Sequence, residues 1–272
     1  MLIGIHAFGR DAGTPSGVAR ARSVGAEGVC LGLEAIQSVA ADPNSPDQAL
    51  RDAVHRYQDA GIEVPAGYAG RFSDAMMLGD AGAEAEYGGL LRQLERLASV
   101  GINSVLYYTT PSRPADPRDE HIAFERFLGF CTRLGEDAAA IRIGIACHPW
   151  LSRPELIHGF QRLEEMCRRI GQAQMGITFC PGGTLAGDDM KGVLDRLRDR
   201  IHFAHLRDQI GAWQSFEEVF PGTGEAAIPA LVKGLRDSGY AGLMCPEHLG
   251  PAAPGQDLEA DAIAYAKRLR DS

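Results

Sequence analysis

Four residues that can bind a metal ion each stand at the end of a short apolar run. The runs end in Gly-Ile-Ala-Cys-His148, Ile-Thr-Phe-Cys180, His-Phe-Ala-His205 and Met-Cys-Pro-Glu247. Two imidazoles, a thiolate and a carboxylate suit a divalent first-row ion such as Mn²⁺, Fe²⁺, Co²⁺ or Zn²⁺. A single histidine or cysteine in a strand is usually a packing residue. The prediction of one metal site therefore depends on four such residues at four successive strand ends.

Alternation along a strand predicts which of these side chains share a face. Residues 144, 146 and 148 share one face, as do 176, 178 and 180, then 201, 203 and 205, and finally 243, 245 and 247. The opposite parity predicts that Cys147 and His202 point toward the helices in structural roles, while Cys245 packs one layer below Glu247. Small residues beneath the ligands are expected to leave room below the site: Gly144, Ala146, Gly176 and Thr178.

Two further residues flank the predicted ligands. His248 follows Glu247 where the chain leaves the strand, so its imidazole can turn back over the metal as a general acid or base. The alternative for His248 is a loop histidine in water. Arg207 lies two residues after His205, and its guanidinium can bind a carboxylate through two hydrogen bonds. The alternative for Arg207 is an ion pair with Asp208 or with an acidic residue of a neighbouring loop.

Apolar runs alternate with amphipathic stretches along the whole chain, and this alternation predicts the elements that position the site. The expected strands are Leu2–Phe8, Gly28–Leu33, Ile62–Gly67, Ile102–Thr109, Arg142–His148, Met175–Cys180, Arg200–Leu206 and Gly242–Glu247. The expected helices are Ser16–Gly25, Asp47–Ala60, Asp80–Val100, Asp119–Asp137, Pro154–Gly171, Asp188–Asp199, Ala226–Ser238 and Asp257–Arg270.

Eight strand–helix units in 272 residues predict α/β architecture: a single (β/α)8 TIM barrel, one domain over residues 1–272. Its active site would lie at the C-terminal strand ends, where the four ligands stand. An open doubly wound sheet would place a glycine-rich phosphate loop after the first strand, and residues 6–13 lack one. The only GxGxx[GA] match, Gly222–Ala227, follows a Pro-Gly turn and is predicted to be a loop.

Composition excludes several functional classes. The formal charge of −9 disfavours nucleic acid as a partner. No apolar run reaches membrane-helix length and no signal peptide is evident, so we expect a cytoplasmic protein without membrane partners. Six cysteines without CxxC spacing indicate neither a disulfide framework nor a zinc ribbon. The only lysines fall in predicted helices, which disfavours Schiff-base and pyridoxal chemistry: Lys191, Lys233 and Lys267.

Several segments resemble xylose-isomerase-like TIM barrels, and more specifically mannonate dehydratases. They are Gly25-Ala-Glu-Gly-Val, Ile-Thr-Phe-Cys-Pro-Gly-Gly-Thr-Leu at 177–185, Arg-Ile-His-Phe-Ala-His-Leu-Arg at 200–207, the stretch 221–242, and Pro-Glu-His at 246–248. Such enzymes convert D-mannonate to 2-keto-3-deoxygluconate and water. The resemblance implies one Mn²⁺-type ion on His148, Cys180, His205 and Glu247.

The same resemblance implies roles for the remaining site residues. His248 takes the place of the family's acid/base histidine, and it forms the catalytic pair with Glu247. His6 stands where the family has a first-strand arginine, and with Arg207 it is expected to bind substrate. Glu247 stands where the family usually has aspartate, and it is the residue type that sugar epimerases of the same superfamily use. A homodimer acting on a small-molecule sugar acid or sugar is also implied by resemblance.

Three other functions remain open at this point. A divalent-metal-dependent sugar isomerase or 3-epimerase would pair two glutamates across the metal, whereas this chain has His148 at the fifth strand. A metal-dependent endonuclease on the same barrel would carry more ligands and a basic groove, against the charge of −9. A barrel that binds sugar without catalysis would return its ligand unchanged.

Overall fold

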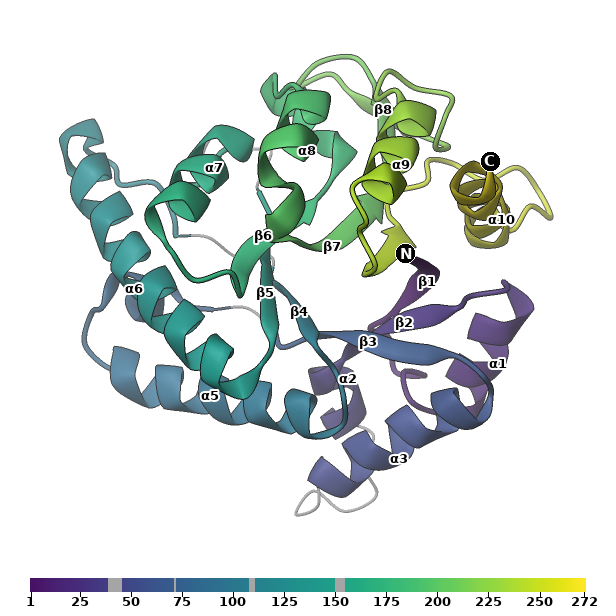
Figure 1. Ribbon diagram of the computed structural model, residues 1–272, viewed down its shortest axis with the longest axis horizontal. Helices are drawn as coiled ribbons and strands as arrows, with labels where there is room; N and C mark the ends of the chain where they lie inside the picture. Colours follow the sequence, from purple (N-terminus) through teal and green to yellow (C-terminus); the bar gives the residue numbers. More distant parts are fainter. Residues whose placement is uncertain (39–45, 71, 108–110, 150–154) are drawn as a thin grey trace.

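The computed structural model describes residues 1–38, 46–70, 72–107, 111–149 and 155–272. Within them eight parallel strands close into a barrel, in the order β1-β10-β7-β6-β5-β4-β3-β2 (Figure 1). Their bounds are β1 Leu2–Ala7, β2 Gly28–Gly32, β3 Glu63–Tyr68, β4 Ser104–Tyr107, β5 Gly144–Cys147, β6 Met175–Phe179, β7 Ile201–Leu206 and β10 Leu243–Pro246. The predicted fold class, a (β/α)8 TIM barrel, is confirmed.

Helices surround the strands in Figure 1. They are α1 Pro15–Ser23, α2 Leu33–Ser38, α3 Pro46–Asp59, α4 Asp74–Leu78, α5 Ala83–Ser99, α6 Glu120–Ile141, α7 Phe160–Arg169, α8 Met190–Leu197, α9 Ile228–Asp237 and α10 Leu258–Asp271. Short 3₁₀ turns at Pro117–Asp119, Pro181–Ala186 and Arg198–Arg200 complete the helical segments. No helix among the described residues is both long and apolar enough to cross a membrane.

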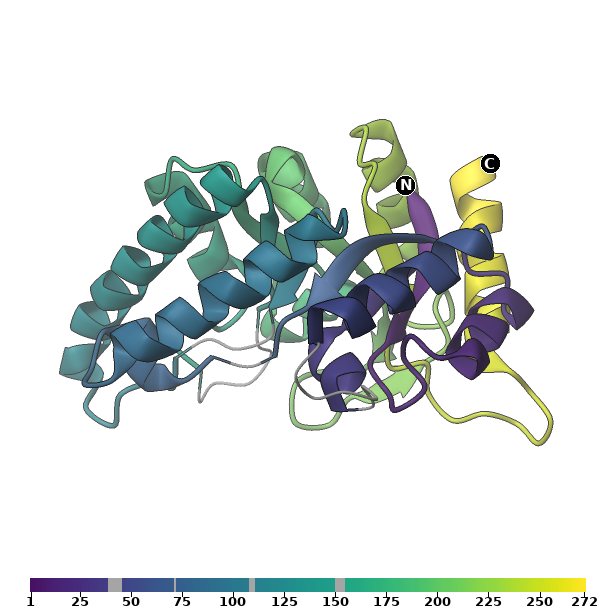
Figure 2. The same cartoon turned by 90° about the horizontal axis from the view of Figure 1, so that it is seen from below.

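Two short helices and one hairpin were not predicted from the sequence. The short helices α2 and α4 follow the second and third strands, and an antiparallel hairpin follows β7, formed by β8 Asp208–Ile210 and β9 Glu217–Val219. The end of the strand predicted to reach Thr109 and the start of the helix predicted from Pro154 lie outside the described residues. Figure 2 shows the hairpin on the same side of the molecule as the loop before α10.

Side-chain alternation divides the apolar residues into two layers. The outer layer packs the strands against the helices, and Cys147 belongs to it as predicted. The inner layer fills the barrel itself, and Cys245 lies there below Glu247, also as predicted. The inner residues are small or medium-sized apart from one phenylalanine: Cys30, Ala66, Leu106, Ala146, Phe203, Leu243 and Cys245.

The predicted orientation of His202 is wrong. Ile177 pairs with Ile201 but Thr178 pairs with Phe203, so β7 carries one extra residue at position 202. This irregularity moves Ile201 into the outer layer and turns the His202 ring inward. A Cβ at Gly144 would lie 2.9 Å from that ring. The space that small residues were expected to leave open is therefore filled, at its lower end, by His202.

Candidate metal centre

The four predicted ligands converge at the C-terminal mouth of the barrel. His148, Cys180 and Glu247 each follow the last residue of their strand (β5, β6 and β10), and His205 lies within β7. One ligand atom from each lies within 4.8 Å of all the others. His205 Nδ1 is 3.1 Å from Glu247 Oε2, and Cys180 Sγ is 4.0 Å from the same oxygen.

This donor set fits a single divalent cation. Bonds of about 2.0–2.3 Å place donors on opposite sides of one ion about 4–4.6 Å apart, which is close to the span of the four atoms. Cys180 and His205 are fully buried, and His148 is nearly so. Burying several ionisable groups together costs free energy unless a partner of opposite charge compensates them, and a metal ion is such a partner.

The charges within the centre also favour cation binding. Burial raises the pKa of the Cys180 thiol, but hydrogen bonds with His148 and His205 outweigh it and bring this pKa down to about 5. Burial lowers the pKa of His205, yet the carboxylate of Glu247 and the Cys180 sulfur raise it to about 9. The pKa of Glu247 is raised by burial but held well below its ordinary value by His205. At neutral pH the centre thus holds a thiolate and a carboxylate.

Arg207 pairs with Glu218, an acidic residue of the neighbouring β8–β9 hairpin, and not with Asp208. Its Nη2 donates to Glu218 Oε1 at 2.5 Å, and its Nη1 lies 3.8 Å from Glu247 Oε2. The side chain is 8% exposed. Gly182 permits this position, because a Cβ there would lie 3.2 Å from the guanidinium. The alternative left open for Arg207 is therefore the observed one, and the guanidinium still borders the ligand Glu247.

Asp208 has a different task. Its carboxylate accepts hydrogen bonds from the backbone N–H groups of Gly222, Gly224 and Ala226, which fixes the loop that follows the hairpin. A Cβ at Gly224 would lie 2.4 Å from Asp208 Oδ1. Gly224 therefore makes room for a carboxylate of the chain itself, and the Gly222–Ala227 segment is a loop as predicted.

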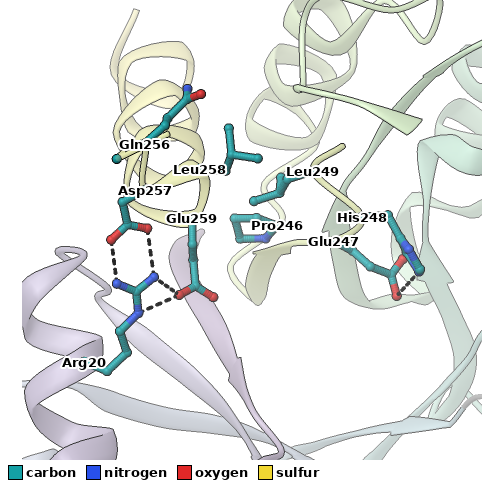
Figure 3. Close-up of a pocket in the computed structure, with 10 residues that line it drawn as sticks. Arg20, Pro246, Glu247, His248, Leu249, Gln256, Asp257, Leu258 and Glu259 are labelled. Carbon is teal, nitrogen blue, oxygen red and sulfur yellow. Dashed lines mark hydrogen bonds and ion pairs between the residues drawn. The ribbon is translucent and has the colours of Figure 1, made fainter. Parts of the chain in front are cut away.

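His248 turns back toward the centre, as predicted. Its Nε2 lies 3.8 Å from Glu247 Oε1, and its Nδ1 lies 2.9 Å from Glu218 Oε2. The residue has φ of 51°, a left-handed conformation that costs a non-glycine residue about 1–2 kcal/mol. Figure 3 shows Glu247 and His248 side by side at one end of a cleft. The side chain is 49% exposed, so a ligand can reach the imidazole.

His6 lies deeper in the mouth, on β1. Its ring centroid is 5.2 Å from that of His205 and 4.7 Å from that of Phe8. Both ring nitrogens are buried, and neither has a hydrogen-bond partner among the described residues. Burial, followed by the charge of His205, lowers the pKa of His6 to about 3. A neutral imidazole in this position can donate one hydrogen bond and accept another.

A cleft of about 680 Å³ runs from Glu247 and His248 toward the start of α10 (Figure 3). Its far wall carries Arg20, which forms ion pairs with Asp257 and Glu259. Of the four predicted ligands, only Glu247 lines this cleft. The cleft therefore offers a lateral approach to His248 from the α10 side.

Glu218, which links Arg207 to His248, was not among the site residues predicted from the sequence. It stands on β9, in a stretch without periodicity or a family motif. Among the histidines outside the centre, His55 and His121 are exposed, whereas His158 is half-buried and its Nδ1 is shielded from solvent. The three lysines lie on helices as predicted.

Comparisons with known proteins agree with this architecture. A family model described as xylose isomerase-like TIM barrel matches residues 18–269. Mannonate dehydratase from Streptococcus suis serotype 2 is similar in structure, with a TM-score of 0.81 at 17% identity, covering 100% of this chain and 93% of that one. A D-psicose 3-epimerase superposes with a TM-score of 0.77 at 15% identity, covering 100% of both chains.

A 3-keto-D-glucoside 4-epimerase from E. coli gives a TM-score of 0.71 at 19% identity, with 100% of both chains covered. At these identities the likeness to the solved structures shows the fold alone. One dehydratase and several epimerases are among them, so the chemistry of this chain has to be argued from its own residues.

Proposed function

The chain belongs to the xylose isomerase-like TIM barrel family, and from that premise we propose that it is a metal-dependent dehydratase of sugar acids. The proposed reaction is that of mannonate dehydratases, in which D-mannonate loses water to give 2-keto-3-deoxygluconate. The observation that carries the proposal is the convergence of His148, Cys180, His205 and Glu247 with His248 beside them. A histidine in place of a glutamate at the end of β5 favours this chemistry over two-carboxylate epimerisation.

We propose that the four converging residues hold one divalent ion. Mn²⁺ is the first candidate, and Zn²⁺, Fe²⁺ and Co²⁺ are alternatives. Such an ion, when bound, would supply Lewis acidity toward the substrate carboxylate and its 2-hydroxyl group. The thiolate of Cys180 and the carboxylate of Glu247 would balance its charge. This balance supports a buried divalent cation without further anions from the chain.

Proton transfer falls to His248 in this proposal, with Glu247 beside it as the second catalytic residue. Nδ1 of His248 faces Glu218, so Nε2 is the nitrogen that can take a proton from C2 or give one to the departing 3-hydroxyl group. His6 and Arg207 are proposed to bind the substrate. The buried nitrogens of His6 suit a hydroxyl group, which can donate to one nitrogen or accept from the other.

A panel of aldonic acids tests this function. The purified protein is incubated with each acid, 2-keto-3-deoxy product is measured, and metal content is determined on the same sample. We expect product from at least one six-carbon acid, and a loss of turnover with full metal content in His248→Asn. Full metal occupancy without product from any acid would overturn the dehydratase proposal.

A sugar isomerase or 3-epimerase is the second candidate. Glu247 is the residue type found in such enzymes, and Glu218 brings a second carboxylate into contact with His248. Incubation with ketoses and aldoses in deuterated water separates the two candidates. Incorporation of deuterium into recovered sugar, without 2-keto-3-deoxy product, would favour isomerisation or epimerisation.

The partner we propose is a small-molecule sugar acid or sugar, not nucleic acid, in line with the net charge of −9. The homodimer and the cytoplasmic location stay predictions. Light scattering on the purified chain measures its molar mass in solution. A mass of twice that of one chain is the expected result, and the mass of a single chain would contradict the dimer.

A further inference from the structure

The β8–β9 hairpin brings to the metal centre a carboxylate that none of the motifs resembling known families contains. Glu218 contacts Arg207 through Oε1 and His248 through Oε2. Its side chain is only 26% exposed. A carboxylate held by a buried guanidinium on one side and an imidazole on the other has a defined orientation, since both oxygens are engaged.

The fold holds both Arg207 and the strand that carries Glu218 in place. The side chain of Arg207 packs over Gly182, where a Cβ would lie only 3.2 Å from it. The hairpin pairs Gln209 with Glu218 in antiparallel register. Directly before Gln209, the carboxylate of Asp208 binds the N–H groups of Gly222 and Gly224. Glu218 therefore stands on a rigid element, and His248 is the adjustable partner.

The contact decides which ring nitrogen of His248 carries hydrogen. An ionised carboxylate can only accept, so the nitrogen 2.9 Å from Glu218 Oε2 must be the donor. In a neutral imidazole with hydrogen on Nδ1, Nε2 is left with its lone pair. That nitrogen lies on the side of Glu247. A histidine without this contact can carry its hydrogen on either ring nitrogen. In addition, the backbone of His248 has φ of 51°, a strained conformation that surrounding contacts must hold in place.

We propose that Glu218 is a positioning residue for His248: it holds hydrogen on Nδ1 and keeps Nε2 directed at the metal centre. This inference rests on the proposed acid/base role of His248. It assigns the β8–β9 hairpin a part in the reaction, although Glu218 neither binds the ion nor touches substrate. Arg207 serves the same arrangement by holding the other carboxylate oxygen.

The first test compares Glu218→Gln and Glu218→Ala with Glu217→Gln, a matched control on the same strand whose side chain is exposed. With the most active aldonic acid, we expect kcat to fall roughly 10- to 100-fold in both Glu218 variants. KM and metal content should change less than about threefold, and Glu217→Gln should match the unaltered chain. Unchanged kcat in Glu218→Ala, or a loss confined to KM, would overturn the inference.

A second test does not depend on activity. Nitrogen-15 spectra of histidine-labelled, Zn²⁺-loaded protein report the tautomer of His248, with His248→Asn used to assign its signals. We expect hydrogen on Nδ1 in the unaltered chain and in Glu217→Gln, and a shift toward hydrogen on Nε2 in Glu218→Ala. The same tautomer in all three proteins would refute the role of Glu218. If the expected tautomer shift occurs but no aldonic acid reacts, the dehydratase proposal fails and the positioning role stands.

Discussion

Cys180 differs from the other five cysteines of the chain in its charge. All six are buried and free, and burial raises the pKa of each thiol. At Cys180 hydrogen bonds with His148 and His205 reverse this effect and bring the pKa to about 5. At Cys147, one residue before a ligand, burial prevails and no imidazole opposes it. Thiolate character therefore distinguishes Cys180, the predicted ligand, from the other five cysteines.

Cys180→Ser is expected to lose bound metal. A serine hydroxyl does not ionise near neutral pH, so the anionic sulfur ligand is replaced by a weak neutral oxygen. We expect metal affinity to fall by at least about tenfold, measured as metal content after dialysis against a weak chelator. Cys147→Ser, which faces the outer layer, is the matched control and should keep its metal. Equal occupancy in the two variants would contradict the assignment of Cys180.

Metal binding is expected to release one proton from His205. The pKa of this residue is about 9 in the metal-free chain, so the imidazole must lose a proton before it can bind an ion at neutral pH. Cys180, with a pKa of about 5, has already lost its own. The apparent affinity should therefore rise about tenfold per pH unit between pH 6.5 and 8.5. Lower pH should weaken binding over the same window.

Titration calorimetry in two buffers of different ionisation enthalpy counts these protons directly. One proton per ion is the expected number from these two residues. Release of two would mean that Cys180 enters as a thiol, and release of none would mean that His205 is neutral before the ion arrives.

At the scale of single residues, the convergence of the four predicted ligands could be predicted because each stands at or next to the end of a strand whose pattern is plain in the sequence. Strand ends meet at one rim of a barrel, so four candidates at four successive ends implied one site. Glu218 could not be found in this way. Its importance comes from a hairpin that returns to the rim, and no local pattern shows where a loop carboxylate will lie.

At the scale of elements, the packing inside the barrel near the start of β7, here called the floor of the barrel, depends on the extra residue at position 202. A strict alternation predicts the directions of Phe203 and His205 correctly but misplaces Ile201 and His202. A bulge inserts one residue and reverses every side chain on one side of it. Nothing in the hydrophobic pattern of 200–206 indicates where that residue is inserted, because the Ile-His-Phe sequence reads as ordinary alternation.

Gly176→Ala is expected to destabilise this floor. A Cβ at Gly176 would lie 2.1 Å from the backbone oxygen of Arg200 and 2.5 Å from the ring of His202. The backbone oxygen cannot move away without shifting β7, so we expect a loss of at least about 1–3 kcal/mol in the free energy of unfolding. Urea titration measures it. Gly171→Ala, where a Cβ would meet no atom within 4 Å, should change stability little. Similar free energies of unfolding for the two variants would contradict the close packing of β7 against Gly176.

At the scale of the whole molecule, barrel closure could be predicted from the eight alternating units, but the contacts that join the first and last elements could not. Closure brings β1 beside β10, with α10 packed against both. In Figure 1 the N-terminal strand and α10 lie next to each other, although they are far apart in the sequence. Glu27, just before β2, joins these parts. It accepts hydrogen bonds from Ile3 N on β1 and from Arg270 on α10.

Arg270→Ala is expected to weaken this closure. Glu27 is 28% exposed and Arg270 20%, so removal of the guanidinium leaves a partly buried carboxylate with one charged partner fewer. We expect a loss of about 1–2 kcal/mol in the free energy of unfolding at neutral pH, against less than about 0.5 kcal/mol for Arg196→Ala, whose ion pair with Glu164 is more exposed.

Burial raises the pKa of Glu27, but Arg270 and the Ile3 N–H outweigh it and lower this pKa overall. The contribution of the pair is thus complete above the ordinary range of a carboxyl group and is lost as pH falls below it. Urea unfolding at pH 7 and pH 3 should show a difference between the unaltered chain and Arg270→Ala that shrinks in acid, and a constant difference would mean that the pair does not act through charge.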